Sequence, residues 1–235
     1  SHPYGDVPFA PVPPVLFPLT GSGRYRAGVA RLVRKMHPGL VEVHNRPDLA
    51  WAISRSFPHI PLVLVLHNDP CGMRMAKTAG ERTALACKMA VVAVSDWVRE
   101  RFLGQGVQGH VSVLPNGLDL AALPAPAPAR EPLVLFAGRV VADKGADAFV
   151  QACATVLPRH HGWQARIIGA DRFGAASPQT EFLTKVQAQA QAAGVQMAGY
   201  LPHAQVLQAM RQAAIVVVPS RWAEPFGMAA LEAMG

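Results

Sequence analysis

Cysteine, aromatic residues and long apolar runs are all scarce in this 235-residue chain. Its three cysteines, Cys71, Cys87 and Cys153, form no CxxC pair, and their odd number argues against a disulfide scaffold. No apolar run approaches the roughly 18 residues of a membrane span, and prolines interrupt the first apolar stretch, which is unlike a signal-peptide core. These absences predict a protein of a reducing compartment, located in the cytoplasm.

Charged residues make up only 16% of the chain, but they are unbalanced and give a net charge of +7. The first 120 residues carry 13 Lys and Arg against 8 Asp and Glu, so most of the excess lies there. A basic stretch at 24–35 is expected on a helix, as a solvated face or as a surface for anionic lipid or another acidic partner. Aromatic residues, at 7%, do not alternate with the basic ones, which argues against nucleic-acid binding.

Hydrophobic residues, at 51%, suffice for a large core, and from Val41 short β-rich runs alternate with helical runs. This alternation is typical of βαβ units around a parallel sheet. In the first half we expect strands at 40–44, 62–66, 90–94 and 110–114. The helices expected there lie at 24–36, 49–56, 80–88 and 97–103.

A Pro/Ala segment at 121–130 separates this half from a second alternating series, and we expect it to form a stiff, extended linker. The second series has expected strands at 133–136, 164–168, 195–198 and 214–218. Its expected helices lie at 146–157, 179–193 and 204–213, with a last one from Pro225. We therefore predict an α/β protein with two Rossmann-like domains, at 1–120 and 131–235, each a mainly parallel sheet flanked by helices.

The two ends of the sequence favour a fragment. The chain starts at Ser1 in a proline-rich segment, and it stops at Gly235 in an apolar helical stretch that a further strand would normally follow. We therefore expect both domains to be incomplete at the termini, and we expect activity of a longer parent chain.

A phosphate-binding pattern follows the first strand of the second series. Gly138 and Arg139 stand at the strand end, where a ligand can approach the glycine backbone and a guanidinium can bind phosphate oxygens. Lys144 adds a second positive charge five residues later. Together these residues are typical of a diphosphate clamp. On this pattern alone, a turn with two exposed cations is the alternative.

The last segment places two glutamates, Glu224 and Glu232, around the expected start of the final helix. On one helix their carboxylates would lie about 12 Å apart along the axis, a spacing that suits two ends of an elongated ligand. Gly227 would leave the N–H groups of the first turn open to a phosphate. A carboxylate at each end with a phosphate site between them matches a nucleotide-sugar, which has sugar hydroxyls at one end, a diphosphate in the middle and ribose hydroxyls at the other end. The alternative is that Glu224 caps the helix and Glu232 is solvated.

These segments, GRVVADKG and PSRWAEPFGMAALEAMG, resemble the donor-binding half of glycosyltransferase family 4. The pattern of two glutamates separated by seven residues is the most specific mark of that family. The resemblance continues over nearly the whole chain, through LVEVHNRP, LVLVLHNDP, VVAVSDWVRERF, VSVLPNGLD, ARIIGAD and VQMAGYLPHAQVLQAM. It implies the two-Rossmann GT-B fold and transfer with retention of anomeric configuration.

The resemblance also implies roles for individual residues. Arg139 and Lys144 would neutralise the departing diphosphate, Glu232 would hold the ribose, and Glu224 would hold hydroxyls of the transferred sugar. Backbone N–H groups for sugar or phosphate would come from Phe226, Gly227 and Met228. In the first domain, His67 matches a histidine near the reaction centre, and Ser95 and Asn116 match positions that we expect to be architectural.

His44, with Asn45 and Arg46, also follows a strand, and it either lines the acceptor side or packs. The glycine-rich loop of the family has no convincing counterpart, because the segment from Thr20 to Gly23 lacks a third glycine. No Asp-x-Asp pair occurs, and the neighbouring His160 and His161 lack a second ligand pair at zinc-like spacing. We therefore expect no metal site and no cofactor.

The predicted activity is transfer of a sugar from a UDP- or GDP-sugar to a hydroxyl of a saccharide or glycolipid acceptor. The basic first half favours an acceptor of lipopolysaccharide or exopolysaccharide synthesis, with peripheral contact to the anionic inner face of a membrane. Two alternatives remain at this point. One is a GT-B epimerase that acts on the nucleotide-sugar alone, and the other is a non-catalytic basic binder of lipid or nucleic acid.

Overall fold

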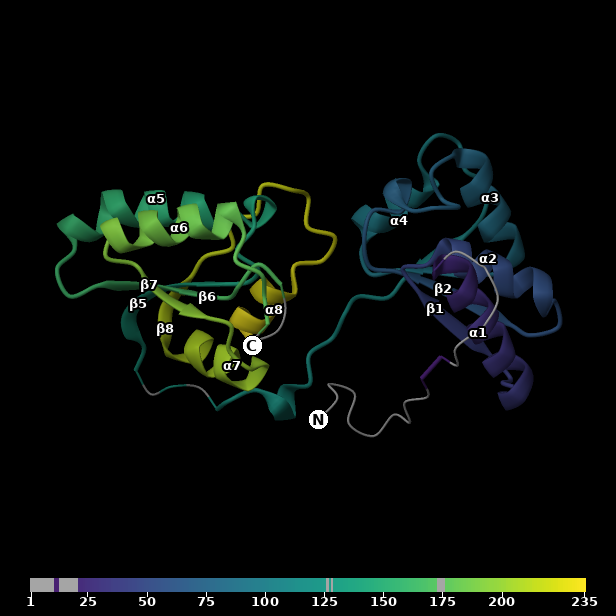
Figure 1. Cartoon of the computed structure of the whole chain (residues 1–235), viewed down its shortest axis with the longest axis horizontal. Coiled ribbons are helices and arrows are strands. Elements are labelled where there is room, and N and C mark those ends of the chain that lie inside the picture. The colour runs from purple at the N-terminus through teal and green to yellow at the C-terminus, as the bar shows by residue number, and fades with distance from the viewer. Residues whose placement is uncertain (1–10, 13–20, 126, 128, 173–175) are drawn as a thin grey trace. The chain divides into compact units, whose positions relative to one another are not determined.

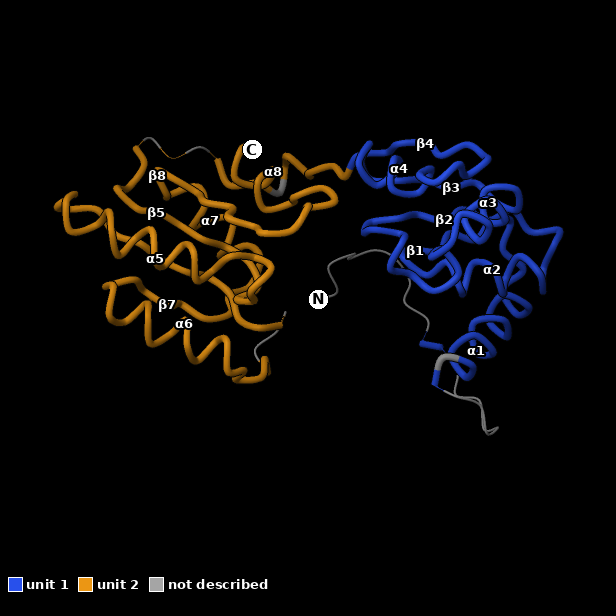
Figure 2. Tube along the Cα trace, turned by 90° about the horizontal axis from the view of Figure 1, so that it is seen from above, with its two compact units in different colours: residues 1–115 blue, residues 116–235 orange. Residues whose placement is uncertain are grey.

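The computed structural model describes residues 11–12, 21–125, 127, 129–172 and 176–235. Thr20 and most of the proline-rich start lie outside the described residues. The chain divides into two compact units, Ser1–Pro115 and Asn116–Gly235, and each is described here by itself (Figures 1 and 2). The segment 121–130, expected as the linker, falls within the second unit.

The first unit contains a four-stranded parallel sheet among its described residues, with the strands in the order β1-β2-β3-β4. Neighbouring strands are in register from Val41 opposite Leu62 and from Val63 opposite Ala90. The strands are β1 (Val41–His44), β2 (Leu62–Leu66), β3 (Ala90–Ala93) and β4 (Val111–Val113). The helices are α1 (Gly21–Met36), α2 (Pro47–Ser56), η1 (Pro70–Gly72), α3 (Ala79–Lys88) and α4 (Asp96–Leu103).

Local sequence signals set where these helices begin. Thr78 and Glu81 form a reciprocal capping box at the start of α3. Ser95 accepts a hydrogen bond from the backbone N–H of Val98 and so caps α4. Proline at the first position of α2 fits because that residue needs no N–H partner. The expected strands and helices of this half are therefore found, with ends shifted by up to three residues.

The second unit contains a parallel sheet whose described strands follow the order β7-β6-β5-β8. Its strands are β5 (Glu131–Ala137), β6 (Gln164–Ile168), β7 (Gln196–Gly199) and β8 (Ala213–Val216). Its α-helices are α5 (Ala146–Val156), α6 (Glu181–Ala192), α7 (His203–Gln212) and α8 (Met228–Met234). Single 3₁₀ turns form η2 (Leu120–Ala122), η3 (Ala142–Lys144) and η4 (Leu157–Arg159).

Both faces of this second sheet are covered by helices, as Figure 1 shows. Phe136 and Ile167 pack with Phe149 and Val186 on the face under α5 and α6. On the opposite face, Leu133, Leu135 and Ile168 pack with α7 and α8. Because helices cover both faces, β5 is apolar on both sides, with Leu133 and Leu135 in one core and Phe136 in the other. The predicted α/β class with two parallel sheets is confirmed.

The last helix corrects the sequence prediction. It begins at Met228 and not at Pro225, because Gly227 has φ of 83°, a left-handed conformation that cannot continue into the helix. Glu224 therefore lies in the loop four residues before the first residue of α8, and not directly before the helix as predicted. The separation of about 12 Å along one helix axis, which assumed both glutamates on it, does not apply.

Candidate functional site

The strand order of the second unit fixes where a ligand can bind. The chain passes from β5 outward to β6 and β7, and then returns to place β8 on the other side of β5. The loops that follow β5 and β8 consequently leave in different directions at the carboxyl edge of the sheet. Such a topological switch point is where doubly wound sheets bind ligands. Gly138, Arg139 and Lys144 follow β5, and Glu224 follows β8.

Two glycines allow unusually close backbone contacts at this edge. A Cβ atom on Gly145 would lie 2.1 Å from the carbonyl oxygen of Pro219, so the loops after β5 and β8 touch. A Cβ atom on Gly169 would lie 1.8 Å from the carbonyl oxygen of Gly138, at the neighbouring ends of β6 and β5. Real Cβ atoms do not approach so closely, and both glycines have positive φ, of 72° and 148°. Glycine is therefore required at both positions.

Gly169→Ala is expected to destabilise the second unit by roughly 3 kcal/mol, because the new methyl group adds a clash to a strained backbone. Urea unfolding of the wild-type and variant chains measures this difference. Gly162→Ala is the matched control, since Gly162 also has positive φ, of 91°, but has no atom within 4 Å of the new methyl group. Equal losses in the two variants would show that the contact with Gly138 is not tight.

A contact between Lys144 and Glu224 joins the two loops. The Lys144 ammonium donates to Oε1 of Glu224, and the Ser220 hydroxyl donates to the same oxygen. Lys144 Nζ also lies 5.2 Å from the ring centroid of Trp222, a cation–π contact. Burial opposes the ionisation of Glu224, but the hydrogen bonds from Lys144 and Ser220 outweigh it and lower its pKa. The site therefore holds an ionised carboxylate beside an ammonium.

A second ion pair fixes the loop that carries Glu224. Both terminal nitrogens of Arg221 donate to the carboxylate of Asp147 at 2.9 Å, a bidentate geometry. The backbone N–H of Arg221 donates to the carbonyl oxygen of Asp143 at 2.8 Å. Burial opposes the ionisation of Asp147, while the bonds from Arg221 lower its pKa below the ordinary value. Arg221 thus holds the loop after β8 against the start of α5.

The other predicted donor residues lie around this pair. Arg139 is partly exposed directly after Gly138, and Phe226, Gly227 and Met228 form the entry to α8. Glu232 lies one turn into α8, with only 14% of its side chain exposed, and accepts from His203 Nε2 at 2.9 Å. The structure therefore brings Lys144 and Glu224 into direct contact and gives Glu232 a separate partner. The ligand roles of all these residues stay predictions.

In the first unit, His67 follows β2 and contacts His44, which ends β1. His67 Nε2 lies 2.8 Å from His44 Nδ1, and His44 Nε2 lies 2.7 Å from Oε1 of Glu42. The Oδ1 of Asn45 accepts from the backbone N–H of His67 at 2.7 Å. His44 is thus exposed and engaged by two polar neighbours. The adjacent parallel strands place these residues together, whereas the sequence prediction treated His44 and His67 separately and omitted Glu42.

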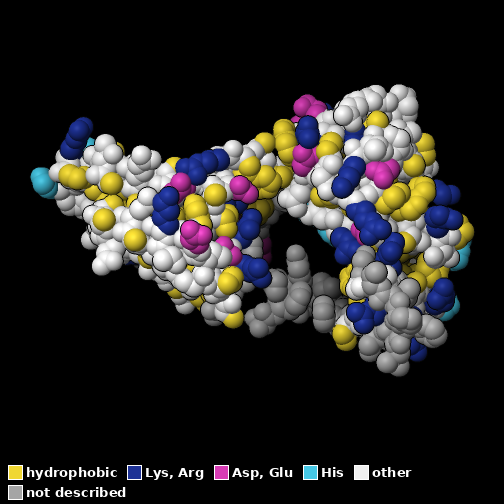
Figure 3. Space-filling view, turned by 45° about the horizontal axis from the view of Figure 1, so that its top comes forward, with side chains coloured by type: hydrophobic (Ala, Val, Ile, Leu, Met, Phe, Trp, Pro, Cys, Tyr) yellow, Lys and Arg dark blue, Asp and Glu magenta, His cyan; other side chains and the backbone are white. Residues whose placement is uncertain are grey.

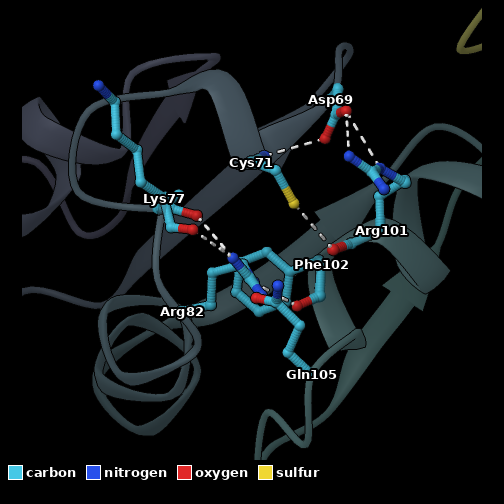
Figure 4. Close-up of polar contacts among 8 residues, drawn as sticks. Asp69, Cys71, Lys77, Arg82, Arg101, Phe102 and Gln105 are labelled. Atoms are coloured by element: carbon cyan, nitrogen blue, oxygen red, sulfur yellow. Dashed lines mark hydrogen bonds and ion pairs between the residues drawn. The ribbon is translucent and has the colours of Figure 1, made fainter.

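A cavity of about 270 Å³ in the first unit was not predicted. Its lining includes Trp97, Arg101, Cys71 and Lys77, together with Arg82, whose side chain is fully buried. Asp69 accepts from Arg101 at 2.8 Å and caps η1 through the backbone N–H of Cys71. The dashed lines in Figure 4 join these residues to one another, Lys77 through its backbone carbonyl, and such a set of contacts is typical of a structural network.

Three further predictions concern the surface charge, the membrane and metal ions. Figure 3 shows that Lys and Arg side chains outnumber acidic ones on the visible face of the first unit. Among the described helices, none is long and apolar enough to span a bilayer. Within the same described part of the chain, no three His, Cys, Asp or Glu side chains are grouped as metal ligands would be. Metal-independent chemistry stays a prediction.

Solved structures share this architecture. HepE from Anabaena, in complex with UDP and glucose, aligns with a TM-score of 0.69 at 20% identity, covering 95% of this chain and 63% of that one. Sucrose-phosphate synthase from Thermosynechococcus elongatus aligns with a TM-score of 0.70 at 21% identity, covering 90% and 57%. Two parallel sheets with flanking helices and these neighbours define the class: the GT-B fold of glycosyltransferases.

Family models and curated relatives agree with this class. The model described as Glycosyltransferase Family 4 matches residues 2–122, and the model described as Glycosyl transferases group 1 matches residues 124–235. The chain belongs to glycosyltransferase family 4.

Curated relatives extend beyond the length of this chain. Glycogen synthase of Mycobacterium tuberculosis is 26% identical in an alignment of 224 residues that covers 85% of this chain and 50% of that protein. The lipopolysaccharide core mannosyltransferase LpcC of Rhizobium leguminosarum bv. viciae is 31% identical over 159 residues, 62% of this chain and 42% of that one. The chain thus spans about half the length of the curated relatives it matches.

Proposed function

We propose that this chain forms part of a retaining glycosyltransferase that uses a UDP- or GDP-sugar as donor. The contact of Lys144 with Glu224 at the switch point between β5 and β8 carries the proposal. It places a positive charge for phosphate and a carboxylate for sugar hydroxyls at one point of the sheet edge. HepE, with the same fold, has been solved with UDP-glucose. That complex supports a nucleotide-sugar as the donor.

Donor binding would rearrange the pair without changing its charges. The diphosphate would attract Lys144 and Arg139, and Glu224 would then be free to accept from hydroxyls of the sugar. Backbone N–H groups at Gly227 and Met228 would lie on the same side of the sheet. Glu232, at the other end of the short α8, would hold the ribose. The ribose hydroxyls would displace His203, which contacts Glu232 in the free protein.

The catalytic contribution follows from where charge develops. As the glycosidic bond to the diphosphate breaks, negative charge grows on the leaving phosphate oxygens, and Lys144 and Arg139 neutralise it. The positive charge comes from side chains, so we propose that the reaction does not depend on a metal ion. The leaving phosphate would take the proton of the acceptor hydroxyl on the face from which it departs, which retains the anomeric configuration.

The acceptor would be a saccharide or glycolipid of lipopolysaccharide or exopolysaccharide synthesis. Two observations support this choice: LpcC is named a lipopolysaccharide core mannosyltransferase, and basic side chains predominate on the visible face of the first unit (Figure 3). A basic surface favours contact with anionic lipid headgroups. We therefore place the protein in the cytoplasm, at the inner face of the membrane.

Thermal unfolding with UDP-, GDP- and ADP-sugars tests donor binding. A donor at 100 times its Kd should stabilise the protein by about 2.7 kcal/mol. The stabilisation should be lost in Lys144→Met and kept in Lys185→Met, which removes an exposed lysine of α6. Absence of any shift, in the chain and in the longest natural protein that contains it, would overturn the proposal. Mass analysis of the products then separates transfer from epimerisation, which leaves the donor mass unchanged.

A further inference from the structure

Three side chains form a line of hydrogen-bonding contacts at the carboxyl ends of β1 and β2. Glu42 Oε1 lies 2.7 Å from His44 Nε2, and His44 Nδ1 lies 2.8 Å from His67 Nε2. The centroids of the two imidazole rings are 5.1 Å apart and the ring planes differ by 21°. Glu42 and His44 are two residues apart on β1, so both project from its exposed face while Val43 is buried. The sheet itself therefore creates the line.

The backbone around His67 is held independently of the imidazoles. Asn45 adopts a left-handed conformation, with φ of 54°, directly after β1. Its backbone N–H donates to the carbonyl oxygen of Val65, and its Oδ1 accepts from the backbone N–H of His67. These bonds tie the end of β1 to the end of β2. Substitution at Glu42 or His44 therefore changes the side-chain line without removing the support of His67.

The contacts determine where each proton lies when both histidines are neutral. The carboxylate of Glu42 can only accept, so His44 carries its proton at Nε2 and donates there. His44 Nδ1 then has a lone pair and accepts from His67 Nε2–H. The proton of His67 is thereby placed at Nε2, and its Nδ1 is left unprotonated. A carboxylate acting through one imidazole thus selects the tautomer of the next.

We propose that Glu42 and His44 are positioning residues that set the tautomer of His67, so that His67 Nδ1 accepts a hydrogen bond from a substrate hydroxyl. This inference rests on the proposed function, since it assigns the line of contacts to glycosyl transfer. The leaving phosphate takes the proton of the attacking hydroxyl, so a neighbouring hydroxyl of the acceptor would donate to His67 Nδ1, and this bond would orient the acceptor for transfer. Neither the sequence patterns nor the family resemblance assigned a role to Glu42.

The surroundings of His67 favour its neutral form. Burial, followed by repulsion from His44, lowers the pKa of His67, and attraction to Glu42 opposes them only in part. Among the described residues, two ion pairs lie after β1 and β2, Arg46 with Asp48 at 2.9 Å and Asp69 with Arg101 at 2.8 Å.

Long-range ¹H–¹⁵N NMR correlations of the imidazole rings test this without substrate. Above the ordinary histidine pKa of about 6.5, His67 should be protonated at Nε2 and unprotonated at Nδ1. Glu42→Gln should mix the two tautomers, because an amide can accept from or donate to His44. Asp96→Asn is the control, since it removes an exposed carboxylate of α4 and should leave the His67 signals unchanged. An Nδ1-protonated His67 in the wild type, or an unchanged tautomer in Glu42→Gln, would overturn the proposal.

Activity provides the second measurement. In the longest natural protein that contains this chain, Glu42→Gln should lower kcat by roughly tenfold and shift the acid limb of its pH profile, with the donor KM unchanged. Glu42→Asp, which retains the charge, should restore part of the rate. An unchanged pH profile would contradict a tautomer-setting role. If no nucleotide-sugar binds but His67 has the stated tautomer, the proposed function is wrong and the tautomer-setting contacts are confirmed. If a nucleotide-sugar binds but His67 has the other tautomer, the proposed function holds and this inference is wrong.

Discussion

Lys144→Met is expected to reduce the rate of sugar transfer by roughly 10²- to 10³-fold, the usual cost of removing one preorganised group that stabilises developing negative charge. Two effects combine in this variant. The departing diphosphate loses the ammonium, and Glu224 keeps its negative charge without its partner. The second effect repels the donor, so donor affinity should fall together with kcat. Steady-state kinetics of the longest natural protein that contains this chain measures both.

A double variant separates the two effects. Lys144→Met with Glu224→Gln removes both charges, so it should regain donor affinity relative to Lys144→Met alone but should not regain kcat. Lys185→Met, which removes an exposed lysine elsewhere in the second unit, should match the wild type. A Lys144→Met enzyme that kept its full turnover would remove Lys144 from the catalytic machinery.

Arg82→Met is expected to destabilise the first unit by roughly 3 to 5 kcal/mol, because it removes the partner of several buried carbonyl groups. The guanidinium is fully buried and makes five hydrogen bonds, of 2.7 to 3.0 Å. Their acceptors are four backbone carbonyls and one side-chain amide: Ala76, Lys77, Phe102 and Gly104, with Oε1 of Gln105 (Figure 4). These bonds join the segment before α3 to the end of α4. Urea unfolding, followed by a probe in the first unit, measures the loss.

Arg99→Met is the matched control on the neighbouring helix. Arg99 forms an exposed i,i+3 pair with Asp96, and its loss should cost less than about 1 kcal/mol. Arg82→Lys should give an intermediate value, since an ammonium has three donors where the guanidinium has five. If Arg82→Met and Arg99→Met unfolded at the same urea concentration, the buried network would have no stabilising role.

The sequence predicted the α/β class because the signal is local and repeated. Apolar β-rich runs such as Leu62–Leu66 and Gln164–Ile168 were placed with correct ends, since a short buried strand is bounded on both sides by polar or turn residues. It also predicted that chemistry would follow β5, because a glycine with nearby cations at a strand end is a local pattern. The meeting of Lys144 with Glu224 depends on strand order, which local patterns do not contain.

The features that the sequence did not predict are long-range or conformational. Arg82 lies in α3, whose sequence mixes polar and apolar residues and does not show which side chains are buried. The structure shows that the Arg82 side chain is fully buried. The bidentate bond from Arg221 to Asp147 joins residues 74 positions apart. The start of α8 was placed too early because proline is a common first residue of a helix, as at Pro225. Glycine adopts helical and left-handed φ values about equally well, so the sequence did not show which of the two Gly227 takes.

Backbone amide NMR of the chain, titrated with a UDP-sugar and in parallel with a GDP-sugar, tests the central claim most directly. The account predicts that one of them perturbs amides in two segments, Gly138–Gly145 after β5 and 217–228 between β8 and α8. The perturbations should disappear in Lys144→Met and remain in Lys185→Met. Perturbations confined to the first unit, or none with either donor at saturating concentration, would contradict the assignment of the donor site to the switch point of the second sheet.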